Sequence, residues 1–436
     1  MEVIGERRSL TRKFLHLLIL EQLETLNLSF GTGEIHYGFQ FLLRCKRLRD
    51  LNLSYLRHVE PRQLLSIIPS LSSIVSLNLQ MTCAIDQVLE AIGNCCSHIQ
   101  ELNLTSTLVS DDGIFRMSGE SQNDGVKRCQ KLQRLIVTET RVSWVGALCA
   151  LRCFPEIRDF DFDKIFQVFE HLDPESEAML ELPKLKLRSL YSVSPCIRGD
   201  SVDAASKICP NIELLSVMNA WIGNEMLYKF MQFENVRSVT IVNNDGMTLD
   251  YDEGVLPFLQ VCGPQLENLI LNKFTTVNLT SLGGSCPRLR KMALCNIGSY
   301  EPKGNAPVRG LFRCLTALEL WFDDRTEFTS KYTLLQLLLD SVHISNLLVK
   351  KSDDFTLETL REIWGFNPMR KLARITLEEC HSMTGLVKVD LGKCHRCPKP
   401  LLTYAKYLPF TFISICNYGY INLLHTAHEH AFNIKQ

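Results

Sequence analysis

The sequence repeats one apolar pattern along most of its length, Leu-x-x-Leu-x-Leu, in which other apolar residues sometimes replace leucine. The first clear copy is Leu23/Leu26/Leu28, and the last regular one is Leu372/Ile375/Leu377. The central apolar residue of each copy, called the marker residue below, recurs at Leu26, Leu51, Leu77, Leu102, Leu135, Phe160, Leu190, Leu215, Val239, Leu269, Met292, Leu318, Leu347 and Ile375. The intervals run from 23 to 33 residues, which is the period of a repeat built from one short strand and one helix.

The physical logic of such a repeat predicts the fold. Alternate side chains of Leu-x-Leu point inward from a short strand, and each coil buries an edge on its neighbour. Helical patterns such as 87–92, 204–208, 227–230 and 334–339 lie between the strands. Because a helix is wider than a strand, the stack curves. We therefore predict an α/β leucine-rich-repeat solenoid of about 14 repeats, a horseshoe with a parallel concave sheet and convex helices.

The repeat also divides the chain. We assign residues 1–22 to an N-terminal cap, 23–391 to the leucine-rich-repeat domain and 392–436 to an atypical C-terminal cap or tail. The string Leu386/Val389/Leu391 follows Ile375 by only 14 residues, so it is expected to pair on the open sheet edge and not to form a coil. Two turn-rich stretches, 117–125 and 298–307, are expected to be loops.

Cysteine occupies one recurrent position. Five cysteines lie six residues before a marker, Cys262 lies seven before, and Phe154 and Phe312 take the same place in other copies; the five are Cys45, Cys96, Cys129, Cys209 and Cys286. Interchange of Cys and Phe indicates a buried apolar slot. We therefore expect free, structural thiols, a reducing setting and a cytoplasmic protein, with the nucleus as a second location.

The phrases around these cysteines carry a family resemblance. Residues 129–135, 209–217 and 286–294 resemble the cysteine-containing leucine-rich repeats of F-box/LRR proteins, and the likeness extends over residues 20–380 or so. In that family the repeats capture a substrate, and an F-box docks on a cullin-based ubiquitin ligase through an adaptor. No F-box motif is found, so the resemblance implies an adaptor only if an F-box is supplied elsewhere.

Composition and motifs argue against several other classes of function. A formal net charge of −1 gives no electrostatic bias toward nucleic acid. The apolar run 408–424 contains two asparagines and two tyrosines, so no membrane span is expected. Cys394-His395-Arg396-Cys397 is half of a zinc site, and no metal is expected there. The sequence shows no phosphate loop, acid–base pair or nucleophile elbow, so we predict neither catalytic residues nor a cofactor.

The residues between the inward positions are candidates for partner binding. Asp159, Asp161 and Asp163 alternate along one strand, where carboxylates two residues apart are about 7 Å apart, too far to share one ion. We expect them to attract a basic partner, the alternative being a solvated face. Trp321 is a candidate hot spot unless residues 322–328 cover it. The full predicted set is Asn103, Arg134, Asp159, Asp161, Asp163, Tyr191, Met218, Asn272, Trp321 and Lys350.

These observations favour a non-enzymatic protein-binding module. The family resemblance suggests substrate recognition in ubiquitin-ligase-dependent degradation. The alternative is a ribonuclease-inhibitor-like or signalling scaffold without a ligase role. We also expect the trimming of an outward side chain, as in Asn103→Ala, to leave stability nearly unchanged.

Overall fold

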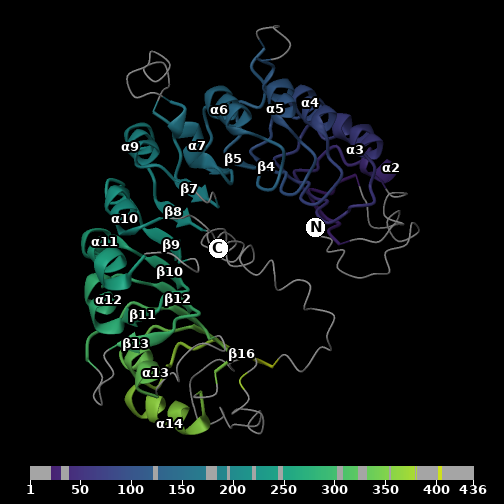
Figure 1. Cartoon of the computed structure of the whole chain (residues 1–436). Helices are drawn as coiled ribbons and strands as arrows, with labels where there is room; N and C mark the ends of the chain where they lie inside the picture. Colours follow the sequence, from purple (N-terminus) through teal and green to yellow (C-terminus); the bar gives the residue numbers. More distant parts are fainter. Residues whose placement is uncertain are drawn as a thin grey trace.

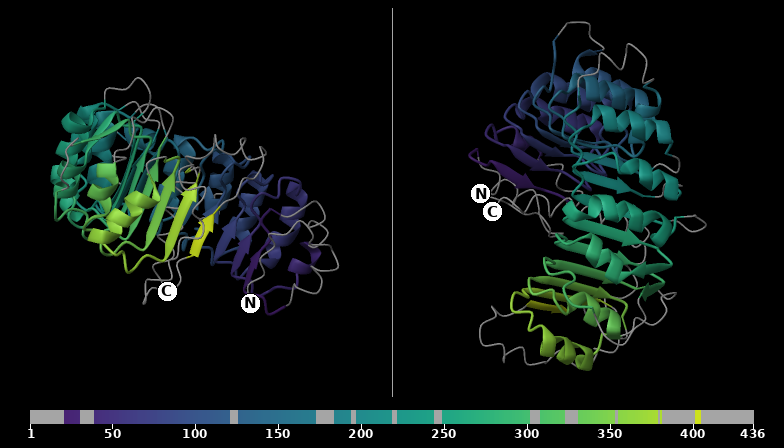
Figure 2. Two further views of the ribbon diagram at one scale, coloured as in Figure 1. Left: turned by 90° about the horizontal axis from the view of Figure 1, so that it is seen from below. Right: turned by 90° about the vertical axis from the view of Figure 1, so that its left-hand side faces the viewer.

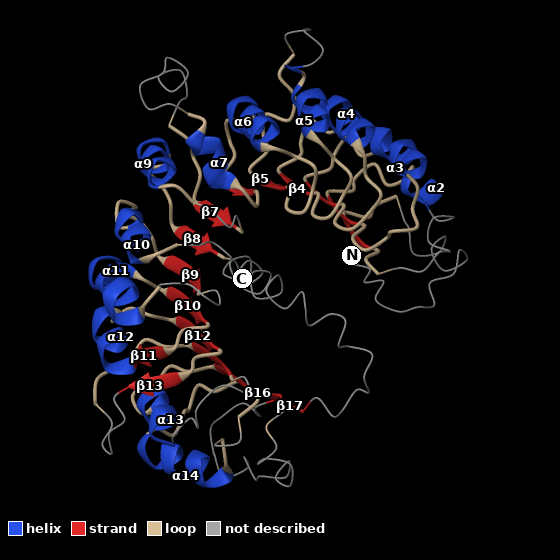
Figure 3. Cartoon of the chain, viewed as in Figure 1, coloured by secondary structure: helices blue, strands red, loops and turns tan. Residues whose placement is uncertain are grey.

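The computed structural model describes residues 21–30, 39–120, 126–172, 184–193, 197–218, 222–243, 249–301, 308–322, 331–352, 355–378, 380 and 401–404. Within them the chain is an α/β leucine-rich-repeat solenoid, in which an outer row of helices and an inner row of strands follow one arc (Figure 1). Figure 3 separates the two rows by colour, with strands lining the concave side.

Every marker residue lies in a strand. The fourteen strands are β1 (Thr25–Asn27), β2 (Asp50–Asn52), β3 (Ser76–Asn78), β4 (Glu101–Asn103), β5 (Arg134–Ile136), β6 (Asp159–Asp161), β7 (Ser189–Ser192), β8 (Leu214–Val217), β9 (Ser238–Val242), β10 (Asn268–Asn272), β12 (Lys291–Cys295), β14 (Ala317–Trp321), β15 (Asn346–Lys350) and β16 (Arg374–Glu378). The markers are buried and belong to one continuous core. Except for β6 and β7, neighbouring strands of this set pair in parallel with marker opposite marker, as in Leu215 opposite Val239. Figure 2 shows the strands stacked side by side along the arc.

The strands form two parallel sheets and not a single concave sheet. One sheet holds β1 to β6, and the other holds β7, β8, β9, β10, β12, β14, β15 and β16, with β17 (Leu401–Tyr404) at its edge. At the junction, the N–H of Arg188 donates to Arg158 O at 2.7 Å and the N–H of Val193 to Asp163 O at 2.9 Å. Beyond the short strand β6, Lys164 and Ser192 form an isolated antiparallel bridge. Backbone hydrogen bonds therefore continue across the junction, but the regular ladder between β6 and β7 is interrupted there.

Helices cover the convex side. They are α2 (Phe39–Leu42), α3 (Pro61–Ile67), α4 (Asp86–Cys95), α5 (Asp111–Ser118), α6 (Trp144–Cys153), α7 (Ile165–Glu170), α9 (Gly199–Ile208), α10 (Asn224–Phe230), α11 (Leu256–Cys262), α12 (Leu279–Ser285), α13 (Lys331–Leu338) and α14 (Leu357–Phe366). A π-helical turn, Tyr251–Val255, leads into α11, and short 3-10 turns follow α3 and α11 at Ile68–Ser70 and Gly263–Gln265. Three of the four helical segments predicted from the sequence fall within these helices, and the fourth, 334–339, ends one residue beyond α13.

Contacts between successive coils fix the start of some helices. Asp111, the first residue of α5, accepts hydrogen bonds from the N–H and the hydroxyl of Ser143 at 2.7 and 2.6 Å. Ser143 in turn is the N-cap of α6, where its side chain accepts from the N–H of Val145. These bonds satisfy donors at a helix N-terminus that the helix itself leaves unpaired.

The cysteine slot is confirmed as a buried position. Phe154, Phe312 and the six cysteines assigned to the slot are at most 3% exposed. Thirteen cysteines lie among the described residues, and all have free thiols. Volume filling in the core, and not redox chemistry, explains this recurrent position.

Two further strands, β13 and β17, lie outside the regular coils. The stretch 298–307, expected to be a loop, begins with strand β13 (Ser299–Glu301), which pairs in parallel with β11 (Thr276–Asn278). The edge of β16 is paired with β17 (Leu401–Tyr404). The strand proposed for this edge, 386–391, lies outside the described residues, as do the Cys394–Cys397 motif and residues 408–424.

Candidate functional site

Because strand side chains alternate, the residues one before and one after each marker point away from the buried core, and the residue three after the marker continues this alternation at or beyond the end of the strand. The strands line the concave side (Figure 3), so these are its three candidate positions. All ten residues predicted to bind a partner occupy one of these positions. Their exposure differs strongly along the arc. The structure therefore separates residues that can meet a partner from residues that pack against neighbouring coils.

In the first four coils the position after the marker is asparagine, and its role is structural. The Oδ1 atoms of Asn27, Asn52, Asn78 and Asn103 each accept a hydrogen bond from the backbone N–H two residues later, at 2.9 to 3.0 Å. Because each asparagine stabilises the backbone at the end of its strand, Asn103 is more than the exposed polar residue expected from the pattern. Its side chain remains partly exposed.

A left-handed residue follows each asparagine turn. Phe30, Tyr55, Met81 and Ser106, four residues after their markers, have φ between 53° and 65°. Four later coils repeat this at Glu139, Lys273, Asn296 and Lys351. The left-handed backbone turns the chain out of the strand, and the asparagine hydrogen bond offsets part of its cost in conformational energy.

The acidic strand β6 is less open than its sequence suggests. Asp161 is only 6% exposed, whereas Asp159 and Asp163 are partly exposed. Asp163 Oδ2 accepts the N–H of Glu139 at 2.8 Å, and burial raises the pKa of this carboxyl group. Asp159 and Arg134 are opposite each other in the register of β5 and β6, so a basic and an acidic position are adjacent.

Three predicted residues in the middle of the arc are buried. Tyr191, Met218 and Asn272 are 7%, 3% and 2% exposed, so the expectation that they present open contact surface is wrong. Tyr191 and Met218 pack with Val242 and Val193 in an apolar cluster separate from the main core. Met218 and Val242 both lie three residues after their markers, so the parallel register of β8 and β9 places them next to each other, and Tyr191 packs on them from β7.

Polar groups in this middle region are also enclosed. Asn272 Oδ1 accepts a hydrogen bond from Asn296 Nδ2 at 3.2 Å. Burial, reinforced by the nearby carboxylates of Asp163 and Asp161, raises the pKa of the Tyr191 hydroxyl above its usual range. This part of the concave side is therefore closed to a partner in this conformation.

The C-terminal part of the face is more open. Trp321 and Lys350 are partly exposed neighbours in the register of β14 and β15. Lys350 Nζ lies 5.4 Å from the centroid of the Trp321 ring, within cation–π distance. Trp321 also packs against the small cluster of Ala293 and Cys295. Its Nε1 has no hydrogen-bond acceptor within the described residues. Most of the 322–328 segment expected to cover it lies outside them.

The site therefore contains a partly exposed asparagine row, an acidic and basic pair of positions near β6, and a Trp–Lys pair on β14 and β15. This arrangement offers hydrogen-bond donors, charge and one large aromatic ring, which are the elements of a protein-binding surface. In the described part of the chain, no helix has the length and apolar character needed to cross a membrane.

No model of a protein family matches the chain, and no curated protein matches its sequence. Among solved structures, it resembles a TLR13 chain from a TLR13–ssRNA13 complex, with 15% identity, a TM-score of 0.41 and coverage of 88% of this chain and 64% of TLR13. It also resembles a chain from a yeast Rad7–Elc1 complex, with 13% identity, a TM-score of 0.42 and coverage of 70% and 78%. A leucine-rich-repeat protein of Leptospira interrogans is similar at 14% identity and a TM-score of 0.41, with coverage of 87% and 90%.

Proposed function

We propose that this chain is a protein–protein interaction module that binds a partner on its concave face, with Trp321 and Lys350 as the anchor. The observation that carries the proposal is the position of a partly exposed tryptophan on the concave side of a rigid sheet. Tryptophan is enriched among residues that dominate binding energy, particularly when its surroundings are already ordered.

The chemistry of the anchor indicates what it would contact. The Trp321 ring is partly exposed although its indole N–H is buried, and Lys350 adds a positive charge above the ring. A carboxylate or backbone carbonyl of the partner would accept from the Lys350 ammonium, while an apolar side chain covers the exposed part of the Trp321 ring. We therefore propose a folded domain or extended segment with an acceptor next to an apolar residue.

The strands near the junction of the two sheets would add long-range attraction. Asp159 on β6 and Asp163, two residues after its end, are partly exposed carboxylates, and Arg134 lies on the preceding strand. A basic region of the partner would be drawn toward β6, and Arg134 would limit the attraction to partners with a matching pattern. Asn103 supplies a further polar contact at this end of the arc.

We further propose that the partner is a substrate selected for ubiquitin-ligase-dependent degradation. This step rests on the resemblance of the cysteine-containing repeats at 129–135, 209–217 and 286–294 to those of F-box/LRR proteins. Docking to the ligase would then require an F-box supplied elsewhere. If the chain instead sequesters or assembles a partner, no adaptor or cullin subunit would accompany it.

The experiment compares proteins captured from native cells by the unaltered chain, by Trp321→Ala/Lys350→Ala and by Phe366→Ala/Arg309→Ala. The second pair is a matched control, because Arg309 lies 5.6 Å from the ring centroid of Phe366, which is on the outer helix α14. We expect a stoichiometric partner that only the first variant loses. Adaptor and cullin subunits in the capture support the ligase role, and their absence beside a partner contradicts it.

A further inference from the structure

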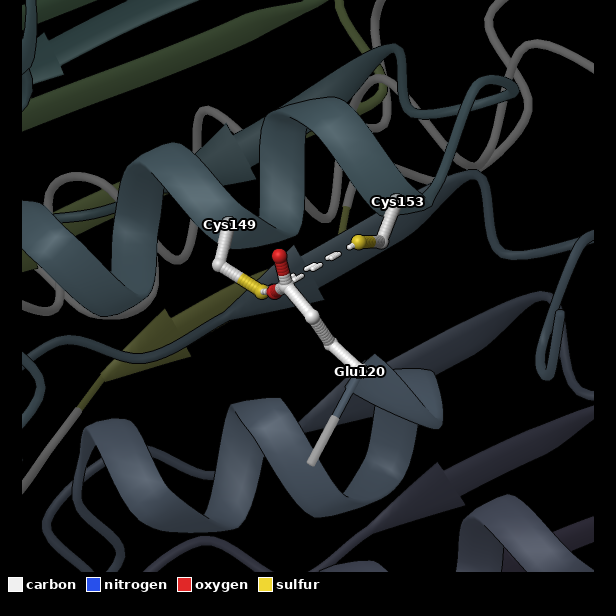
Figure 4. A group of neighbouring side chains, drawn as sticks. All are labelled: Glu120, Cys149 and Cys153. Atoms are coloured by element: carbon white, nitrogen blue, oxygen red, sulfur yellow. Dashed lines mark hydrogen bonds between the residues drawn. The ribbon is translucent and has the colours of Figure 1, made fainter. Parts of the chain in front are cut away.

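Three potential metal ligands meet at the surface between the fourth and fifth coils. Cys149 and Cys153 are four residues apart on α6, and Glu120 follows the end of α5 (Figure 4). The two Sγ atoms are 3.9 Å apart. Glu120 Oε2 lies 2.7 Å from Cys149 Sγ and 3.9 Å from Cys153 Sγ. All three ligand atoms are within 4.8 Å of one another.

The backbone brings these residues together for definable reasons. Residues four apart in a helix lie on the same face, so α6 presents both thiols in one direction. The helix α5 ends at Ser118 and is capped by Gly119, whose φ of 89° reverses the chain and directs Glu120 over α6. A Cβ atom at this glycine would lie 2.4 Å from Val126 O. The turn therefore requires glycine, both because its φ is positive and because there is no room for a side chain.

The spacing fits a small tetrahedral ion. With Zn–S bonds of about 2.3 Å and Zn–O bonds of about 2.0 Å, tetrahedral angles place two sulfurs about 3.8 Å apart and a sulfur and an oxygen about 3.5 Å apart. The S–S separation agrees with that figure, and the separation of Cys153 Sγ from Glu120 Oε2 agrees within about half an ångström. The third, from Cys149 to Glu120, must lengthen, which rotation of the exposed Glu120 side chain permits.

We propose that Glu120, Cys149 and Cys153 form a zinc-binding site, with the fourth coordination position open to water or an external ligand. Two sulfur ligands favour zinc over calcium or magnesium, which take oxygen ligands. Binding would release the two thiol protons. The positive charge of Lys127 acts on Cys153 and would offset part of the excess negative charge of two thiolates and a carboxylate around a divalent ion.

The proposed ion would join α5 to α6 across the widest interval in the repeat, the 33 residues between Leu102 and Leu135. It would cross-link two coils whose helices also pack directly and whose helix starts are tied by Asp111 and Ser143. A ligand that binds only the folded state raises the unfolding temperature. Zinc should therefore stabilise this region, independently of any partner on the concave face.

The test uses the full chain in reductant with Cys394→Ser/Cys397→Ser, which removes the only other closely spaced cysteine motif singled out in the sequence. Cobalt(II) is titrated as the probe. One equivalent should produce a sulfur-to-cobalt charge-transfer band and the intense visible bands of tetrahedral coordination, and zinc should abolish both. The unfolding temperature should rise with zinc.

Variants assign the signal. Cys149→Ser/Cys153→Ser should abolish the charge-transfer band, whereas Cys83→Ser/Cys314→Ser, which alters two thiols elsewhere, should retain it. Glu120→Gln changes an exposed side chain, so it should fold normally and weaken binding at least about tenfold. If the Cys394→Ser/Cys397→Ser chain, in which Glu120, Cys149 and Cys153 are unaltered, shows no charge-transfer band, the proposal is overturned. So does a band that survives Cys149→Ser/Cys153→Ser, or unchanged affinity in Glu120→Gln.

Discussion

Asn103 Oδ1 accepts a hydrogen bond from the backbone N–H of Thr105 at 2.9 Å. The same oxygen accepts from the Thr105 hydroxyl at 2.8 Å. Equivalent asparagines in the three preceding coils make the backbone bond as well. A residue on the candidate binding face thus also stabilises the repeat, so the effect of its replacement on folding must be measured apart from any effect on a partner.

Asn103→Ala should lower the free energy of unfolding by about 1 kcal/mol, because it removes an acceptor from the backbone at the end of β4. Asn103→Asp keeps an acceptor oxygen in the same place, so its free energy of unfolding should fall by less than that of Asn103→Ala. Urea denaturation of both variants provides the comparison. Equal stability of the alanine variant and the original chain would favour the simpler expectation of a neutral surface residue.

Leu215 is the marker residue of β8 and is 2% exposed, opposite Leu190 and Val239. Leu215→Ala should cost about 2–5 kcal/mol, and Leu215→Asp should cost more because it buries an unpaired charge and disrupts neighbouring coils. Leu214→Ala is the matched control, since Leu214 is partly exposed on the other side of the same strand. Thermal melts with equal losses for Leu214→Ala and Leu215→Ala would contradict the inward assignment.

Stability should fall at alkaline pH. Burial raises the pKa of the Cys96, Cys129 and Cys286 thiols from 9.0 to about 12, and that of Cys262 to about 11. Since the unfolded chain loses these protons first, their contribution is complete below pH 9.0 and is lost as pH rises toward those values. Urea midpoints in reductant should therefore decline across this range.

A variant tests the source of the alkaline decline. Cys286→Ala should lower stability at neutral pH because it leaves a small cavity, but its decline above the thiol's ordinary pKa should be shallower. Parallel curves for the variant and the original chain would show that Cys286 does not contribute to the pH dependence.

The acidic strand is tested by association kinetics once a partner is in hand. Asp159→Asn/Asp161→Asn/Asp163→Asn should slow association at low salt and flatten its salt dependence, since it removes three negative charges near the concave face. Asn at 163 can still accept the Glu139 N–H, so the fold should be retained. Asp200→Asn/Glu225→Gln/Asp252→Asn makes the same change in net charge at exposed convex positions. Identical on-rates for the two triple variants would exclude steering by β6.

The period of Leu-x-x-Leu-x-Leu was sufficient to predict the strands, the convex helices and the cysteine slot, because each follows from local side-chain direction. The break after β6 was not predictable in this way, since it depends on how Lys164 and Ser192 meet across two coils. The same holds for Tyr191 and Met218, whose burial arises from packing along the arc.

The candidate sites show the same limit. Trp321 was predictable as an aromatic residue at a concave position, but its cation–π contact with Lys350 depends on the register of β14 and β15. Cys149 and Cys153 have the spacing of two ligands on one helix face, a signal that sequence alone contains. Glu120, however, joins them only because the left-handed Gly119 turns the chain over α6.

The most direct test of the central claim is the affinity of the captured partner for Trp321→Ala, measured by calorimetry beside Phe366→Ala. A hot-spot tryptophan is worth about 2 kcal/mol or more, so Trp321→Ala should weaken binding roughly 30-fold or more. Phe366→Ala, on the convex side, should leave the dissociation constant unchanged within about twofold, a difference of only about 0.4 kcal/mol. Equal affinities for Trp321→Ala and the original chain, with the fold intact, would contradict binding at the concave face through this anchor.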